Sequence, residues 1–202
     1  FGENLQTIGR EAFKNNNGLT IIEIPNSLQT INDGVFYGCN SIKSITLPFV
    51  GYSRTSTTGY SSAFGYIFGY NTSSSSSYNY HQYSGTNYYG FYVPSSLKTV
   101  TVTDATQIPA GAFYYEDSIT KVNLNDEIAI VGNQAFYKVP WYENLKNEFE
   151  IVGDNLLLKY NGTSSTLTIP ENVKHLGANV FKNHTEITSV VLPENLTSIG
   201  YQ

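Results

Sequence analysis

Residues 33–48 read DGVFYGCNSIKSITLP, and this stretch contains the two patterns that decide the fold. Its second part, NSIKSITLP (40–48), has the spacing apolar-x-x-apolar-x-apolar and ends in proline. Its first part completes another pattern, apolar-x-x-apolar-Gly-x-x-Ala-Phe, here with Val35 and Phe36 in the last two places. Both patterns return along the chain in alternation, so the sequence is built from an internal repeat.

The proline-ended pattern predicts short β-strands. Its last three positions alternate along the strand, β-branched residues dominate it, and the proline that often follows cannot donate to a strand ladder. We therefore expect six short parallel strands. The six copies are Leu19-Ile22-Ile24, Ile42-Ile45-Leu47, Leu97-Val100-Val102, Ile119-Val122-Leu124, Ser164-Leu167-Ile169 and Ile187-Val190-Leu192.

The second pattern predicts a short extended piece, then a turn, then one helical turn around Ala-Phe. Its small alanine or valine allows neighbouring coils to approach, and its phenylalanine fills the interior. The copies begin at Leu5, Leu28, Ala105, Ile128, Val173 and Leu196. We expect the helical turns near residues 10–15, 33–38, 110–115, 133–138 and 178–183.

The period of the repeat is about 23 residues. The strand pattern begins at residues 19, 42, 97, 119, 164 and 187, so two steps, of 55 and 45 residues, exceed the period by 32 and 22 residues. One coil cannot bury its own apolar face, whereas six stacked coils can form one continuous core. The sequence thus predicts a right-handed solenoid with two insertions.

The repeat resembles the BspA-type leucine-rich repeat. The resemblance rests on LTSIG (196–200), GNQAFYKV (132–139), DGVFYGC (33–39) and NSIKSITLP (40–48), and it covers nearly the whole chain. It implies a fold that is α/β by leucine-rich-repeat convention but rich in β-structure, and a family common on surface proteins of host-associated bacteria. The chain departs from the family pattern in keeping the cysteine after Ala-Phe only at Cys39.

We expect one solenoid domain over residues 1–202, and a longer parent protein, because the chain lacks methionine and starts and stops inside a repeat. The first insertion, residues 49–96, contains ten tyrosines and no Asp or Glu. The second insertion, residues 137–163, carries EFEIV and LLLKY on either side of GDN, which predicts a hairpin.

The composition excludes several classes of protein. Charged residues make up 13% of the chain and the net charge is −5, which argues against a nucleic-acid binder and against a polybasic membrane contact. No apolar run is long enough to span a bilayer. The single cysteine cannot form an internal disulfide.

No motif indicates catalysis, a metal site or a cofactor. The histidines, at 81, 175 and 184, lack metal-ligand spacing with other ligand-type residues. Cys39 stands at a repeat position, so we expect a buried, inert thiol. Glu143, Glu148 and Glu150 are best explained as a solvated face of the second insertion.

The first insertion is the best candidate for a contact surface. Tyrosine, serine, glycine and asparagine dominate adaptable binding loops, and tyrosine offers a large contact area with few torsions to freeze. The candidate contact residues are Tyr78, Tyr80, Tyr83, Tyr88, Tyr89 and Trp141. Alternatively, the aromatic residues clamp the insertion onto the flank of the solenoid as a small core formed by Phe49, Phe64, Tyr66, Phe68 and Phe91.

The resemblance implies a non-enzymatic module, on the cell surface or secreted, that binds a protein or glycan ligand in adhesion or host interaction. The alternative is a structural stalk that carries another domain. A glycan-processing enzyme is the least supported reading, because no pair of carboxylates has the spacing that glycoside hydrolysis requires.

Overall fold

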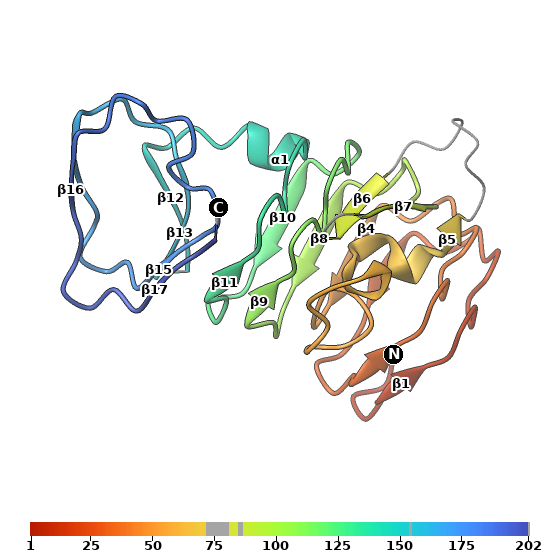
Figure 1. Cartoon of the computed structure of the whole chain (residues 1–202). Helices are drawn as coiled ribbons and strands as arrows, with labels where there is room; N and C mark the ends of the chain where they lie inside the picture. Colours follow the sequence, from red (N-terminus) through yellow and green to blue (C-terminus); the bar gives the residue numbers. More distant parts are fainter. Residues whose placement is uncertain (72–80, 85–86, 154, 202) are drawn as a thin grey trace.

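The computed structural model shows a right-handed solenoid, as the repeat predicts. It describes residues 1–71, 81–84, 87–153 and 155–201. The coils stack side by side, with the N-terminal strand β1 (Thr7–Ile8) toward one end and β16 (Ser189–Val191) at the other (Figure 1). Two rows of short parallel strands run along this stack.

The first row contains the strands that the proline-ended pattern predicts. Four of them pair in parallel in the order β2-β4-β8-β10, and β14 pairs in parallel with β16. In β4 and β8, Ile45 lies opposite Val100, so equivalent apolar residues of neighbouring coils share the interior face. The bounds are β2 (Ile21–Glu23), β4 (Ser44–Leu47), β8 (Thr99–Val102), β10 (Lys121–Leu124) and β14 (Thr166–Thr168).

The second row consists of two-residue strands from the second pattern. Each pairs in parallel with the equivalent strand of a neighbouring coil: β1 with β3, β9 with β11, and β15 with β17. Their bounds are β3 (Thr30–Ile31), β9 (Gln107–Ile108), β11 (Ile130–Val131), β15 (His175–Leu176) and β17 (Ser198–Ile199).

Glycine follows several of these short strands because the backbone of the preceding coil passes very close. A Cβ atom on Gly132 would lie 2.4 Å from the backbone nitrogen of Ala110, and one on Gly200 would lie 2.6 Å from that of Ala178. Gly9 has the same repeat position in the first coil, and no atom lies within 4 Å of the place its Cβ would take. Close stacking therefore leaves no room for a side chain at Gly132 and Gly200, whereas Asn32 is accommodated at the same repeat position above Ile8.

The segments around Ala-Phe differ from the expected helices. Each is a run of hydrogen-bonded turns with two residues of positive φ four positions apart, such as Glu11 (φ 56°) and Asn15 (φ 62°). A left-handed residue cannot continue an α-helix, so only every second backbone N–H group bonds within its own segment, as that of Lys14 does to the carbonyl of Glu11 (3.0 Å). The other pairs are Gly34 and Gly38, Gly111 and Tyr115, Gln134 and Lys138, and Asn179 and Asn183.

The alternating backbone directs every second N–H group of a turn to a carbonyl of the next coil. Gly111 donates to Asn133 (2.9 Å), and Phe113 donates to Ala135 (2.8 Å). Two residues later in the chain, the N–H group of Tyr115 donates to the carbonyl of Tyr137 (2.8 Å). We call this series of hydrogen bonds between successive turns the turn ladder, and it joins the coils independently of the two rows of strands.

The phenylalanines of the turns stack inside the solenoid. The rings of Phe13 and Phe36 are 5.8 Å apart, and those of Phe113 and Phe136 are 5.2 Å apart and nearly parallel. The ring of Tyr142, from the second insertion, continues the column beyond Phe136 at 6.1 Å. Aromatic stacking therefore follows the same axis as the turn ladder.

The first insertion lies within the stack over residues 49–69. Its short helices are η1 (Tyr60–Ser62) and η2 (Phe64–Phe68). Phe36 donates its backbone N–H to Ile67 (2.8 Å), and Phe64 donates to Ala112 (2.9 Å), so this segment continues the turn ladder between two coils. The small aromatic core is confirmed, because Phe49, Phe64, Tyr66, Phe68 and Phe91 are buried, but it is part of the main core and not a clamp on the flank.

Arg54 anchors the loop that leads into this segment. Its guanidinium donates to the carbonyl of Leu28 and pairs with the carboxylate of Asp104, each at 2.5 Å, and lies 5.1 Å from the centre of the Phe49 ring. The insertion is thus tied to the coil before it and to the coil after it.

Three described strands of the first insertion form a small antiparallel sheet. Its strands are β5 (Tyr70–Asn71), β6 (His81–Ser84) and β7 (Asn87–Phe91), in the order β5-β7-β6. Strand β7 also packs near η2, which connects the sheet to the stacked segment.

The second insertion contains the predicted hairpin. Helix α1 (Pro140–Glu143) comes first, and then β12 (Phe149–Val152) pairs antiparallel with β13 (Leu156–Tyr160). On its other edge β13 pairs in parallel with β15, with Leu156 opposite His175. The hairpin therefore takes a place in the second row of strands.

The buried apolar residues form two clusters, where the repeat predicts one continuous core. The clusters meet at β13, whose Leu156 and Leu158 belong to the first cluster and whose Leu157 belongs to the second. Successive side chains of a strand point to opposite faces, so β13 separates the two clusters. Among the described residues, no strand of the first row lies between β10 and β14.

The third residue after the phenylalanine of each turn differs in chemical type from coil to coil. Cys39 is buried, as predicted, and its thiol donates to the carbonyl of Phe13 at 2.9 Å. Glu116 takes the equivalent place and is fully buried. Burial, and then the neighbouring Asp117 charge, raise the pKa of the Glu116 carboxyl well above its usual value.

Replacing Gly132 with alanine should lower the free energy of unfolding by about 1–3 kcal/mol, because the added methyl group collides with the backbone of the preceding coil. Urea unfolding measures this change. Gly9→Ala is the matched control and should change stability by less than about 0.5 kcal/mol. Equal effects of the two substitutions would contradict the stacking explanation.

Glu116→Gln should become increasingly stabilising as the pH rises. A carboxyl whose pKa is raised by folding favours the folded state below its unfolded pKa and loses this contribution as the pH rises through its folded pKa. Unfolding free energies at pH 4 and pH 7 test this, with a difference on the order of 1 kcal/mol or more expected between them. Glu171→Gln, on the surface, is the control, and a pH-independent difference for Glu116→Gln would refute the account.

Candidate functional site

The tyrosines predicted as ligand contacts belong to the first insertion. Tyr78 and Tyr80 lie outside the described residues. The backbone of Tyr83 in β6 lies opposite that of Tyr88 in β7, and Tyr89 follows in the same strand. The contact role of these five tyrosines stays a prediction.

Trp141 lies in α1 and packs against the core. Its backbone N–H donates to the carbonyl of Ile119 (3.2 Å), and its ring meets Phe136 edge-on at 5.1 Å. The side chain is only partly buried, so one part of it remains open to solvent. Its role in ligand contact also stays a prediction.

Three tyrosines that were not singled out in the sequence come together on the outside of the turns. The rings of Tyr114 and Tyr137 stack at 5.0 Å, and Tyr115 meets Tyr137 edge-on at 5.6 Å. Tyr114 is buried at the base of the group, whereas Tyr115 and Tyr137 are 43% and 38% exposed. We call these three residues the tyrosine cluster.

The turn ladder positions the tyrosine cluster. Tyr114 and Tyr137 follow the phenylalanines of two successive turns, so they are one coil apart, and Tyr115 donates its backbone N–H to the carbonyl of Tyr137 (2.8 Å). The rings are therefore held at a fixed spacing before any ligand binds. Reading the residue after each Ala-Phe along the repeat would have revealed this group: Lys14, Tyr37, Tyr114, Tyr137 and Lys182.

Tyr137 is also one of the residues that line a groove of about 600 Å³, which we call the junction groove. It lies between the turn at residues 133–138 and the turn at residues 178–183, with α1 and β13 also contributing to its walls. Its lining residues are Val131, Gly132, Gln134, Ala135, Phe136, Tyr137, Tyr142, Glu143, Leu158, Ala178, Asn179, Lys182 and Asn183.

The junction groove exists because one coil lacks its turn. Other coils turn after two residues of the second-row strand, but β13 continues through Leu158 to Tyr160 and pairs with β12. The turn that would stand between residues 133–138 and 178–183 is therefore missing. Tyr142 fills the interior place of its phenylalanine.

The two walls of the junction groove are joined at one end. Ala178 donates its backbone N–H to the carbonyl of Val131 (3.1 Å), and the side-chain amide of Asn179 donates to that of Asn133 (2.5 Å). These contacts fix the position of one wall relative to the other.

Lys159 and Tyr142 form a rigid part of the groove region. The ammonium group of Lys159 donates to the carbonyl of Tyr142 (3.0 Å) and lies 5.0 Å from the centre of its ring. Burial, and then the charge of Glu143, raise the pKa of the Tyr142 hydroxyl to about 12. The hydroxyl therefore stays protonated at neutral pH and can donate a hydrogen bond.

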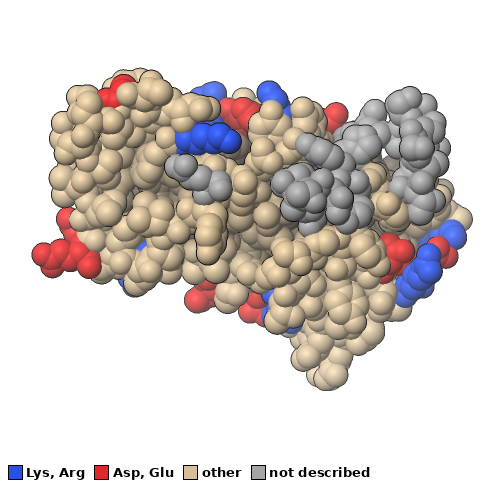
Figure 2. All heavy atoms as spheres, viewed as in Figure 1, with Lys and Arg blue, Asp and Glu red and all other residues tan. Residues whose placement is uncertain are grey.

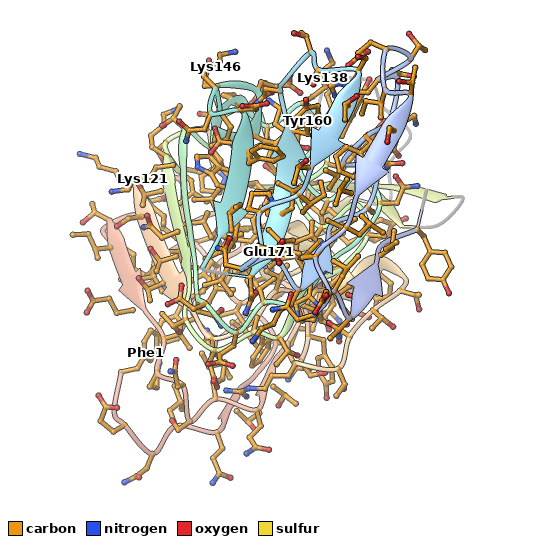
Figure 3. The ribbon with its side chains drawn as sticks, turned by 90° about the vertical axis from the view of Figure 1, so that its left-hand side faces the viewer. Phe1, Lys121, Lys138, Lys146, Tyr160 and Glu171 are labelled. Atoms are coloured by element: carbon orange, nitrogen blue, oxygen red, sulfur yellow. The ribbon has the colours of Figure 1, made fainter. Side chains whose placement is uncertain are left out.

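The charge around the candidate site is balanced and sparse. Among the described residues, Glu143 and Lys182 are the charged side chains that line the groove. Lys138 and Lys146 lie at the same edge of the coils when the stack is viewed from the C-terminal side (Figure 3). On the face shown in Figure 2, charges of both signs are scattered among a large neutral surface. Such a surface suits a ligand without a strong charge.

The described residues offer no recognisable catalytic group at this site. Glu143 is the one carboxylate that lines the groove, and no group of three His, Cys, Asp or Glu side chains gathers anywhere in the described part of the chain. The arrangement can hold a ligand through aromatic rings, amides and backbone groups.

The strand face of the first row is less suited to binding. Many of its outward side chains carry hydroxyl groups, although Ile21 and Val191 are exposed toward its two ends, and Asn123 donates to the hydroxyl of Thr101 at 2.9 Å. A flat row of hydroxyl groups lacks the aromatic anchors that dominate binding energy.

The sequence model of the family described as the BspA type Leucine rich repeat region matches residues 1–107 and 106–202, with six copies. None of the curated proteins matches the chain. Within the described residues, no helix has the length and apolar character needed to cross a lipid bilayer.

Three solved structures of bacterial proteins are similar to the chain. A leucine-rich repeat protein from Bacteroides ovatus is 21% identical with a TM-score of 0.42, and the match covers 99% of this chain and 38% of that protein. A leucine rich cell surface protein from Faecalibacterium prausnitzii is 21% identical with a TM-score of 0.33, and the match covers 96% of this chain and 60% of that protein. A leucine-rich repeat protein from Eubacterium ventriosum is 19% identical with a TM-score of 0.25, and the match covers 98% of this chain and 46% of that protein. The chain thus spans less than two thirds of each.

Proposed function

We propose that this chain, which belongs to the BspA-type leucine-rich repeat family, is a non-enzymatic module that binds a protein or glycan outside the bacterial cell. The observation that carries this proposal is the tyrosine cluster at the mouth of the junction groove. Adhesion to a host or to another surface is the role that such a module would serve.

The tyrosine cluster has the properties of a binding surface. Tyr115 and Tyr137 expose large rings with hydroxyl groups, while Tyr114 supports them from below. Because the backbone holds these rings in place, little side-chain entropy is lost on binding. Tyrosine is also enriched among the residues that dominate interface energies.

The hairpin of the first insertion is a second proposed contact region. Strands β6 and β7 carry Tyr83, Tyr88 and Tyr89, and Tyr78 and Tyr80 precede them in the chain. A large partner could contact both regions, since the insertion is built into the same stack of coils as the tyrosine cluster.

The alternative of a structural stalk is supported by the shape of the chain. The coils stack along one direction, so that the two ends of the solenoid are far apart (Figure 1). A spacer would use this length and would need no exposed aromatic cluster. The two proposals therefore differ in what they expect of Tyr115 and Tyr137.

Binding to arrays of purified extracellular proteins and of glycans tests the proposed function. The double variant Tyr115→Ser/Tyr137→Ser should bind the recognised component at least about tenfold more weakly than the parent, with an unchanged melting temperature, because its rings are exposed. Tyr60→Ser is the matched control, since Tyr60 is 44% exposed and lies in the first insertion. Failure of the parent chain to bind any protein or glycan would favour the stalk.

A further inference from the structure

We propose that the junction groove binds a peptide segment of a partner protein, and that the main chain of this peptide completes the turn ladder between residues 133–138 and 178–183. This inference rests on the proposed function, because it specifies one kind of partner for the same site. It follows from the backbone groups on the two walls of the groove.

The chain itself shows how a segment can fill a gap between two turns. Residues 64–67 lie between the turn at residues 33–38 and the turn at residues 110–115. On one side the carbonyls of Tyr66 and Ile67 accept hydrogen bonds, and on the other side Phe64 donates its N–H to Ala112. A short segment outside the regular repeat can therefore continue the turn ladder.

One wall of the junction groove presents backbone donors. In the preceding coil, the N–H groups of Gly111, Phe113 and Tyr115 donate to the next turn. The residues at the same repeat positions in the turn at residues 133–138 are Gln134, Phe136 and Lys138, of which the first two line the groove. The N–H groups of these three residues have no hydrogen-bond partner among the described residues.

The opposite wall presents backbone acceptors. The carbonyls of Asn133, Ala135 and Tyr137 accept the hydrogen bonds of the preceding turn. Their repeat equivalents beyond the gap are Ala178, Val180 and Lys182, and no described residue donates to these three carbonyls. Among the described residues, the turn before the gap thus has unpaired donors and the turn beyond it has unpaired acceptors, and Gln134, Phe136, Ala178 and Lys182 line the groove between them. One intervening polypeptide segment would satisfy this pattern.

The peptide would occupy the part of the groove beyond the end at which Ala178 bonds to Val131. Neighbouring chains joined by backbone hydrogen bonds lie about 4.8 Å apart, so one intervening chain needs walls about twice that distance apart. The groove volume of about 600 Å³ lies within the range of ligand pockets. Because Tyr142 already fills the interior place of the missing phenylalanine, the peptide should carry a small residue at that position.

An oligosaccharide fits this pattern less well than a peptide. Peptides that add to an open edge are held by alternating main-chain donors and acceptors, and both kinds are present here at repeat positions two residues apart. Sugar hydroxyl groups have no such fixed alternation. The tyrosine cluster at the mouth of the groove would then contact side chains of the bound segment.

The probe is the synthetic peptide GNQAGYKV, which has the sequence of residues 132–139 with glycine in place of Phe136. Binding is measured through the fluorescence of Trp141, the only tryptophan of the chain, whose ring packs against Phe136 in the groove wall. Amide hydrogen exchange of Gln134 and Phe136 gives a second readout. We expect saturable binding and at least about tenfold slower exchange of these two amides in the complex.

Two controls separate the backbone pattern from nonspecific contact. A peptide N-methylated at the residues corresponding to Gln134, Phe136 and Lys138 cannot donate to the acceptor wall and should bind at least about tenfold more weakly. Lys182→Phe places a bulky side chain at the groove without adding a second tryptophan and should weaken binding to a similar extent. Lys14→Phe, at the same repeat position of another coil, should leave binding unchanged.

Several results would overturn the inference. These are no binding of the peptide, equal binding of the N-methylated peptide, equal binding to the Lys182→Phe variant, or unprotected amides at Gln134 and Phe136 in the complex. A saturable change in Trp141 fluorescence on adding neutral tetrasaccharides, with no change on adding the peptide, would assign the groove to glycans. If the array experiment still detects a protein or glycan partner in any of these cases, the proposed function stands and the inference alone fails.

Discussion

The hydrogen bonds between successive turns are the constraint on which the rest of this structure depends. They bring each coil so close to the previous one that Gly132 and Gly200 leave no room for a side chain. They also require left-handed backbone at two places in each turn, which residues as different as Gly111 and Gln134 adopt. The same spacing stacks the phenylalanine rings inside and two tyrosine rings outside.

The two insertions meet this constraint in opposite ways. The first replaces a regular return segment, and residues 64–67 restore the hydrogen bonds between the coils on either side. The second supplies a hairpin and the ring of Tyr142 to the interior, but its strand β13 continues where other coils turn. The core is filled in both cases, whereas the backbone connection between turns is restored only in the first.

Much of the fold could be predicted from the sequence, because apolar spacing records which side chains face the core. The strands of the first row, the hairpin of the second insertion and the burial of Cys39 follow from such patterns. The turns were expected as helices because Ala-Phe favours helical structure locally. The alternation of left-handed residues, such as Tyr115 and Lys138, is not indicated by that local preference. The junction groove depends on a turn that does not form after β13, and a repeat period does not show this. The contact role of the tyrosines in the first insertion remains a prediction. The tyrosine cluster could have been found in the sequence by comparing the residues that follow each Ala-Phe in several coils.

The separation of the first-row strands into two sheets affects how the chain should come apart. In a stack of repeats, cooperativity passes from each unit to its neighbour, and it is weakest where the interface between neighbours is smallest. Among the described residues no backbone ladder of the first row crosses between β10 and β14, and the two apolar clusters divide at β13. The coils that contain β14 to β17 therefore form a unit able to melt separately from the rest.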